Sequence, residues 1–252
     1  MTDDGPRVVG AERVLTVLRE LAQRSGGASL DELSQAVGGS KPTIHRALAS
    51  LRKMGFARQD ERGSYLLGDE FIRLAFANHE ERPEYLRIQP ALQALAHRFG
   101  ETVHYAVLDG SSIVYRAKVD PAEGSVRLTS TIGGRNPVHS TACGKLLLSF
   151  ALTSDDGVRA WARKAELVSR TPRTITDPDR FAAELALIRK RGYATEAEEN
   201  ETGISCLAVP VWLGSPTLPS GAVSVSALTY RTSLDSLVDA VAEIQEIVGT
   251  PR

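Results

Sequence analysis

The N-terminal part of the sequence constrains the fold most strongly, because it carries start and stop signals for short helices in quick succession. Apolar residues recur at helical spacing over residues 10–24, and Gly26-Gly27 ends that helix. Ser29 and Glu32 form the S-x-x-E pattern of a capping box, which predicts the start of a second helix. Gly38-Gly39 predicts the end of that helix after about two turns. Two short helices joined by a tight turn are therefore expected.

A third helix with two chemically different sides follows the second glycine pair. Ser40 is its predicted N-cap. Apolar side chains at helical spacing form a stripe along one side: Ile44, Leu48 and Leu51. Arg46 and Lys53 point away from this stripe, and Thr43 and Ser50 flank them. The helix is therefore expected to bury one side and to present cations and hydroxyl groups on the other.

Two short predicted strands, residues 56–59 and 64–67, follow that helix and form a hairpin. This order is typical of a winged helix-turn-helix, whose second helix enters the major groove of DNA. Between residues 41 and 62, six Lys/Arg stand against two acidic residues, a surplus that favours contact with phosphates. A small helical module for protein contacts is the alternative. We predict contacts to double-stranded operator DNA, with Arg46 reading a guanine, from Ser40, Lys41, Thr43, Arg46, Ser50, Lys53, Arg58 and Arg62.

The length of 252 residues predicts more than one domain. We expect an α+β chain with a winged helix-turn-helix at residues 1–67, a linker helix within residues 68–84 and a second domain at residues 85–252, where helices and strands alternate. The second domain is expected to have helices at residues 89–98, 141–151 and 177–191, strands at residues 102–108, 113–119, 126–132, 204–212 and 222–228, and a last helix over residues 234–248.

The two late strands of the second domain have different faces, because side chains alternate along a strand. One face carries bulky core residues, namely Leu207, Val209, Val211, Val223 and Val225. The other face carries the small side chains Cys206, Ala208, Ser224 and Ser226, which leave room and hydroxyl groups for a small polar ligand. Close packing of a helix against these small residues is the alternative.

A helix that starts near Ser140-Thr141 offers a second element for such a ligand. Its first amides, at Ala142, Cys143 and Gly144, are expected to be unpaired, and the helix dipole places partial positive charge there. A carboxylate could therefore bind at this end of the helix without a dedicated arginine.

Several segments in order resemble the IclR family of bacterial transcription regulators. The string GSKPTIHRALASLRKMGFARQD resembles the family's recognition helix and wing, and RNPVHSTACGKLLLSF resembles its stretch that ends in A-x-G-K before a helix. GISCLAVPV and GAVSVSAL resemble the two late strands that flank the family's effector pocket. The likeness covers essentially residues 10–250.

The resemblance implies a second domain of GAF-like α/β fold, pairing of two chains through the DNA-binding half, and often a dimer of dimers, hence a tetramer. It implies effector contacts from Ala142, Cys143, Cys206, Ser224 and Ser226. Ala142-Cys143 stand where members with small-acid effectors often have Gly-Ala, which would shrink or reshape the pocket. Glu196 stands where some members carry a ligand-contacting aspartate, and a solvated acidic loop is the alternative.

The predicted function is therefore a ligand-responsive transcription regulator, repressor or activator, that binds operator DNA as a dimer and responds to a small organic acid. The alternative is a metabolite-binding enzyme that carries an autoregulatory DNA-binding domain. His139 precedes Cys143 by four residues, but no third orienting residue accompanies this pair, so thiol catalysis is not favoured.

The remaining composition argues against several other classes of protein. The five histidines and two cysteines lack ligand spacing, so no metal is expected, and no cofactor is expected because no glycine-rich phosphate loop follows a strand. Apolar runs are too short for a membrane span, the start lacks a secretory signal, and two cysteines make no disulfide framework. We therefore expect a cytoplasmic protein with no membrane association.

Overall fold

The computed structural model describes residues 10–80, 83–121, 128–215 and 217–249. Contacts divide the chain into two compact units, Met1–Arg82 and Pro83–Arg252. Among the described residues, no helix is both long and apolar enough to cross a membrane.

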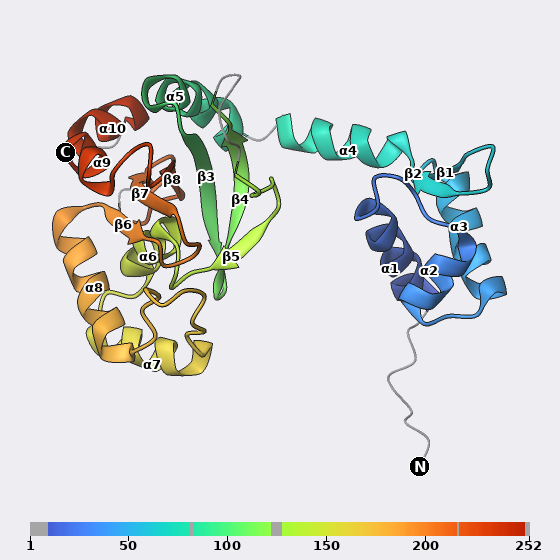
Figure 1. Ribbon diagram of the computed structural model, residues 1–252, viewed down its shortest axis with the longest axis horizontal. Coiled ribbons are helices and arrows are strands. Elements are labelled where there is room, and N and C mark those ends of the chain that lie inside the picture. The colour runs from blue at the N-terminus through green and yellow to red at the C-terminus, as the bar shows by residue number, and fades with distance from the viewer. Residues whose placement is uncertain (1–9, 81–82, 122–127, 216, 250–252) are drawn as a thin grey trace, which may run out of the picture. The chain divides into compact units, whose positions relative to one another are not determined.

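The first unit has the predicted order of a winged helix-turn-helix (Figure 1). Its elements are α1 (Gly10–Ala22), α2 (Leu30–Val37), α3 (Lys41–Lys53), the antiparallel strands β1 (Ala57–Gln59) and β2 (Tyr65–Leu67), and α4 (Asp69–Glu80). The capping box is confirmed: the Ser29 hydroxyl accepts from the Glu32 amide at 3.2 Å, and the Ser29 amide donates to Glu32 Oε2 at 2.7 Å. At α3 the predicted cap is only partly right. Ser40 occupies the N-cap position, but its hydroxyl lies 2.8 Å from that of Thr43 and caps no backbone amide.

One small core holds the three helices and the hairpin of the first unit together. Val17, Leu33, Ile44 and Leu48 are fully buried in it, as the predicted stripe on α3 requires. Residue Tyr65 of β2 is also buried there and pairs with Ala28 through an isolated β-bridge, which joins the hairpin to the segment before α2. The opposite side of α3 therefore remains exposed.

The second unit consists of one six-stranded antiparallel sheet between two layers of helices (Figure 1). The strands are β3 (Thr102–Asp109), β4 (Ser112–Val119), β5 (Arg135–Pro137), β6 (Ala194–Ala197), β7 (Ile204–Val211) and β8 (Gly221–Leu228), in the order β5-β4-β3-β8-β7-β6. One face packs against α5 (Pro83–Phe99), α9 (Leu234–Asp239) and α10 (Val241–Val248). The other packs against α6 (Ala142–Ala151) and α8 (Pro178–Arg191), with α7 (Asp155–Ala165) behind them.

The register of β7 and β8 confirms the predicted difference between their faces. Cys206 pairs with Ser226, and Ala208 pairs with Ser224, on the side of α6. Leu207 pairs with Val225 on the other side, where the large apolar residues of the second core lie. Both readings of the small-residue face apply in part, because Ala208 packs in the core with α6 whereas the cysteine and both serines border a cavity.

Several predicted elements of the second unit need correction. The helix expected at residues 89–98 begins at Pro83, because proline is well suited to the first turn of a helix. Of the strand expected at residues 126–132, residues 126 and 127 lie outside the described part, and residues 128–132 form no strand. The last predicted helix is interrupted at Ala240, which separates α9 from α10. Three elements of the second unit were not predicted from the sequence: β5, β6 and α7.

Candidate functional site

The exposed side of α3 and the adjacent hairpin carry the residues predicted to contact DNA. Lys41, Arg46, Ser50 and Lys53 are exposed on α3, whereas Thr43 is half-buried. Arg58 is exposed on β1, and Arg62 is exposed in the turn that follows. The structure therefore gathers these side chains on one helix and one hairpin of the same unit.

Two contacts organise this surface further. Arg52 Nη1 donates to Gln59 Oε1 at 3.0 Å and so links α3 to the hairpin. Lys41 Nζ lies 2.7 Å from Asp31 Oδ1, an exposed pair that costs little to break because water screens it. Arg52 was not predicted as a functional residue from the sequence. Its hydrogen bond to Gln59 favours a role in holding the hairpin against α3.

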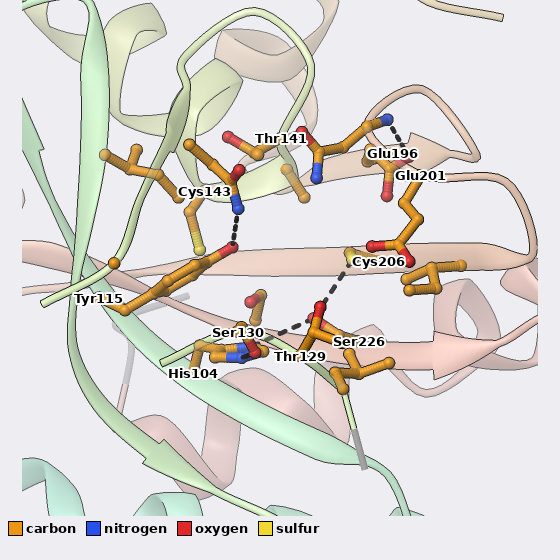
Figure 2. Close-up of a pocket in the computed structure, with 18 of the residues that line it drawn as sticks. His104, Tyr115, Thr129, Ser130, Thr141, Cys143, Glu196, Glu201, Cys206 and Ser226 are labelled. Atoms are coloured by element: carbon orange, nitrogen blue, oxygen red, sulfur yellow. Dashed lines mark hydrogen bonds between the residues drawn. The ribbon is translucent and has the colours of Figure 1, made fainter. Parts of the chain in front are cut away.

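A cavity of about 280 Å³ lies in the second unit between the N-terminal end of α6 and the small-residue face of the sheet (Figure 2). Residues predicted to bind the effector line it as follows: Ala142, Cys143, Glu196, Cys206, Ser224 and Ser226. Gly144 does not line the cavity. Its amide donates to Thr141 Oγ1 at 3.2 Å, and a Cβ atom there would lie 2.3 Å from the Val138 carbonyl oxygen. The expected contact from the Gly144 amide is therefore corrected, since that amide is used to cap the helix.

A chain of polar side chains crosses the sheet side of the cavity (Figure 2). The Cys206 thiol donates to Ser226 Oγ at 3.2 Å, and Ser226 Oγ lies 3.3 Å from His104 Nδ1. His104 Nε2 lies 2.7 Å from Ser130 Oγ, in the segment at residues 128–131 that also lines the cavity. Burial lowers the pKa of His104 to about 3, so its imidazole is neutral at physiological pH. The chain therefore offers neutral donors and acceptors to a ligand.

Tyr115 forms an aromatic wall of the cavity together with His104. Their ring centroids are 4.5 Å apart, and the Asn136 amide donates to the Tyr115 hydroxyl at 3.2 Å. The register of the β3–β4 hairpin places Tyr115 here: from the pair Asp109–Ser112 onward it sets Tyr115 opposite Ala106, and a bulge in β4 follows only after this pair, where Tyr105 pairs with Ala117. Burial raises the pKa of Tyr115, so its phenol stays protonated. Neither ring was predicted from the sequence, although alternation gives a signal for both: His104 shares a face of β3 with Ala106, and Tyr115 shares a face of β4 with Ile113.

Glu196 is almost fully buried at the edge strand β6, which rules out the solvated-loop alternative. Its Oε1 accepts from the amide of Glu199 and, at 3.1 Å, from the amide of Asn200. Burial is the main reason that its pKa is raised to about 7, and the amide hydrogen bonds oppose this shift only in part. A carboxyl group that exchanges its proton near neutral pH therefore faces the cavity.

The histidine and cysteine considered as a nucleophile pair are directed to different partners. His139 Nε2 lies 2.9 Å from the Val168 carbonyl oxygen, whereas the Cys143 thiol is directed to the Ala222 carbonyl oxygen at 3.8 Å. Burial raises the pKa of the Cys143 thiol to about 12, so the nucleophilic thiolate is disfavoured. Among the described residues, no group of three His, Cys, Asp or Glu is placed to hold a metal ion.

Comparison with known proteins gives the same result for both units. A family model described as bacterial transcriptional regulator IclR C-terminal matches residues 85–250, and the IclR helix-turn-helix domain matches residues 10–61. The HTH-type transcriptional regulator XynR of Escherichia coli is 30% identical over 242 residues, covering 96% of this chain and 94% of that protein. The glycerol operon regulatory protein of Streptomyces coelicolor is 33% identical over 221 residues, covering 87% and 85%. The crystal structure of the Thermotoga maritima IclR superposes with a TM-score of 0.81 at 28% identity, covering 95% of this chain and 96% of that one.

Proposed function

Because this chain belongs to the IclR family of bacterial transcription regulators, we propose that its first unit binds operator DNA and that its second unit binds a small organic acid that controls this binding. The observation that carries the proposal is the cavity beside α6, where the small-residue face, a buried carboxyl group and an aromatic wall converge. Such a concave site with a few directed polar groups is typical of a small-molecule site.

The DNA-binding part of the proposal rests on the exposed side of α3. Arg46 would reach a guanine in the major groove, while Lys53 and the hairpin residues Arg58 and Arg62 would contact phosphates. The stripe behind them is buried, so removing these exposed side chains should leave the fold of the unit intact. Their effect on DNA binding is therefore separable from stability.

The ligand-binding part rests on the size and polarity of the cavity. Its volume of about 280 Å³ corresponds to about nine water molecules at roughly 30 Å³ each, which suits a small metabolite. Arg170, a residue not predicted from the sequence, also lines the cavity, and its Nε donates to the Asn200 carbonyl oxygen at 3.2 Å. A carboxylate would lie toward Arg170 and the first turn of α6, and hydroxyl groups would lie toward Ser224 and Ser226. An apolar or aromatic part of the same ligand would lie against the ring of Tyr115.

Assembly as a homodimer is part of the proposal, because a two-fold dimer matches an inverted-repeat operator. Helix α4 leaves Ile72, Leu74 and Phe76 exposed, and Leu15 on α1 is 65% exposed. Large apolar side chains of this kind on a single unit favour burial against a second copy. We extend the proposal to a dimer of dimers on the family resemblance alone.

We further propose that the protein acts without catalysis and in the cytoplasm. Cys143 has its pKa raised by burial and lacks a base beside it in the geometry described above, which argues against the enzyme alternative. Cys143 and Cys206 are both free thiols, as a reducing compartment would keep them.

A thermal-shift screen with small carboxylates and aromatic acids tests the ligand-binding part of the proposal. A ligand that binds only the folded second unit raises its melting temperature. The matched experiment is DNA binding to the promoter of the protein's own gene at several salt concentrations, where phosphate contacts require affinity to fall as salt rises. Turnover of a ligand found in the screen would favour the enzyme alternative instead.

A further inference from the structure

Helix α6 carries a lysine whose burial needs an explanation. Lys145 is 1% exposed, and the helix around it is otherwise largely apolar. Its ammonium group lies 2.6 Å from Glu199 Oε1 and 3.6 Å from Glu184 Oε1. A buried ammonium group is tolerated only when carboxylates compensate its lost hydration. An apolar side chain of similar size at this position would avoid the free-energy cost of removing a charge from water.

The main partner of Lys145 belongs to a loop that forms one wall of the cavity. Glu199 lies in the loop at residues 198–203 between β6 and β7, and Asn200 and Glu201 of this loop line the cavity. Glu198 begins the loop with φ of 58°, in the left-handed region that a side chain disfavours. Such a conformation persists only where the surroundings over-determine it. The loop therefore needs contacts on several sides to keep its position.

Those contacts come from several segments of the second unit. Glu196 Oε1 on β6 accepts from the amides of Glu199 and Asn200. Thr174 Oγ1 donates to the Glu199 carbonyl oxygen at 2.6 Å, and Ser140 Oγ, just before α6, donates to Asn200 Oδ1 at 3.0 Å. These bonds hold the backbone and one amide side chain, whereas Lys145 holds the buried Glu199 carboxylate directly.

The ion pair between Lys145 and Glu199 is part of a larger group of buried and half-buried charges next to the loop. Arg191 Nη2 lies 3.2 Å from Glu184 Oε1, so two cations and two carboxylates form one connected group. Glu199 Oε2 is buried and has no hydrogen-bond partner among the described residues, which leaves Lys145 as the counter-ion in contact with that carboxylate. Without the ammonium group the carboxylate would have to gain a proton or turn toward water, and either change would move the loop.

We propose that Lys145 is a positioning residue of the effector cavity, whose ion pair with Glu199 fixes the loop at residues 198–203 as a closed wall. This inference rests on the proposed function only because ligand binding would depend on a fixed wall. The position of the loop can be tested in the absence of any ligand. Lys145 would act through Glu199 and touch no ligand, since it does not line the cavity.

The test is hydrogen exchange of the full-length protein carrying Lys145→Met, a change that keeps much of the side-chain length and removes the charge. The amides of Glu199 and Asn200 should exchange at least tenfold faster than in the wild type, measured relative to amides of β3 in the same sample. Glu199→Gln breaks the same ion pair from the loop side, leaves Lys145 near Glu184, and should act in the same direction. It serves as the second variant if the first folds poorly.

The matched control is Leu95→Ala, which empties a fully buried position on α5 at the opposite face of the sheet. It should destabilise the unit as a whole, so loop and β3 amides should accelerate together. A second readout is the rate at which iodoacetamide alkylates Cys206, because this thiol borders the cavity. If the wall opens, the alkylation rate should rise several-fold.

Selective acceleration of the loop in both ion-pair variants, with faster alkylation, would support the proposal. Loop exchange that rises only in step with β3, as in the control, with alkylation at the wild-type rate, would overturn it and leave Lys145 a structural residue. Both readouts use no effector. A protein that binds no carboxylate in the thermal-shift screen would therefore refute the proposed ligand without affecting this result.

Discussion

Replacement of Glu196 by glutamine should make the second unit more stable at alkaline pH and have a much smaller effect in acid. The folded protein raises the pKa of Glu196 from the ordinary 4.5 to about 7, chiefly because the carboxyl group is buried. Between these two values the folded state holds a proton that the unfolded chain releases. Stability therefore falls as the pH rises through this window, and the full loss is reached above pH 7. At 1.36 kcal/mol per pH unit, the ionised carboxylate costs about 3 kcal/mol.

The glutamine side chain removes this cost because it does not ionise, and its carbonyl oxygen can still accept from the amides of Glu199 and Asn200. The assay is urea denaturation followed by tryptophan fluorescence. The chain has two tryptophans, Trp161 and Trp212, and both lie in the second unit, so the signal reports on that unit alone.

The stability difference between Glu196→Gln and the wild type should grow by about 3 kcal/mol from pH 4.5 to pH 8.5. Glu201→Gln is the control, because Glu201 is an exposed carboxyl group of the neighbouring loop and its replacement should change little at either pH. A difference between Glu196→Gln and the wild type that stays constant across this range would refute the reasoning, since Glu196 would then be ionised in the fold as it is in the unfolded chain.

Three further predictions concern the first unit. Arg46→Ala should weaken operator binding by about 1–3 kcal/mol in a fluorescence-anisotropy titration while leaving the unit folded; unchanged affinity and sequence preference would remove Arg46 from the interface. Phe76→Glu should lower the dimer fraction in analytical ultracentrifugation, because it places a charge on the exposed apolar side of α4, and an unchanged sedimentation profile would move the interface elsewhere. Ser29→Ala should destabilise the first unit by about 1 kcal/mol through loss of the capping box, seen as an earlier helical melt by circular dichroism; an unaltered melt would show that the cap contributes nothing.

The sequence predicted those parts of the molecule that local chemistry decides. The capping box at Ser29, the apolar stripe of α3 and the small-residue face with Ser224 and Ser226 each follow from spacing alone, and the structure confirms them. Each needs only the period of a helix or a strand and no knowledge of distant residues. The winged helix-turn-helix was therefore accessible from the sequence.

Other parts depended on contacts between distant segments. The register of the hairpin places Tyr115 on the α6 side beside Ala106, but the cavity next to its ring is enclosed by α6 and residues 128–131, which no local signal connects to β4. Gly144 was assigned a free amide because Thr141, whose hydroxyl accepts from the amide three residues later, was not recognised as the N-cap of α6. The role of Lys145 depends on Glu199, 54 residues later in the chain, which no periodicity could connect to it.

The most direct test of the account is operator affinity with and without a carboxylate that raises the melting temperature in the screen, at one fixed salt concentration. The wild type should change its operator affinity by about 5–150-fold on binding that carboxylate, the usual range for coupled sites. Ser226→Leu, which fills the cavity from its sheet side, should bind the operator but no longer respond to the carboxylate. A wild type whose operator affinity is the same with and without bound carboxylate, or a Ser226→Leu variant that responds as the wild type does, would contradict the account.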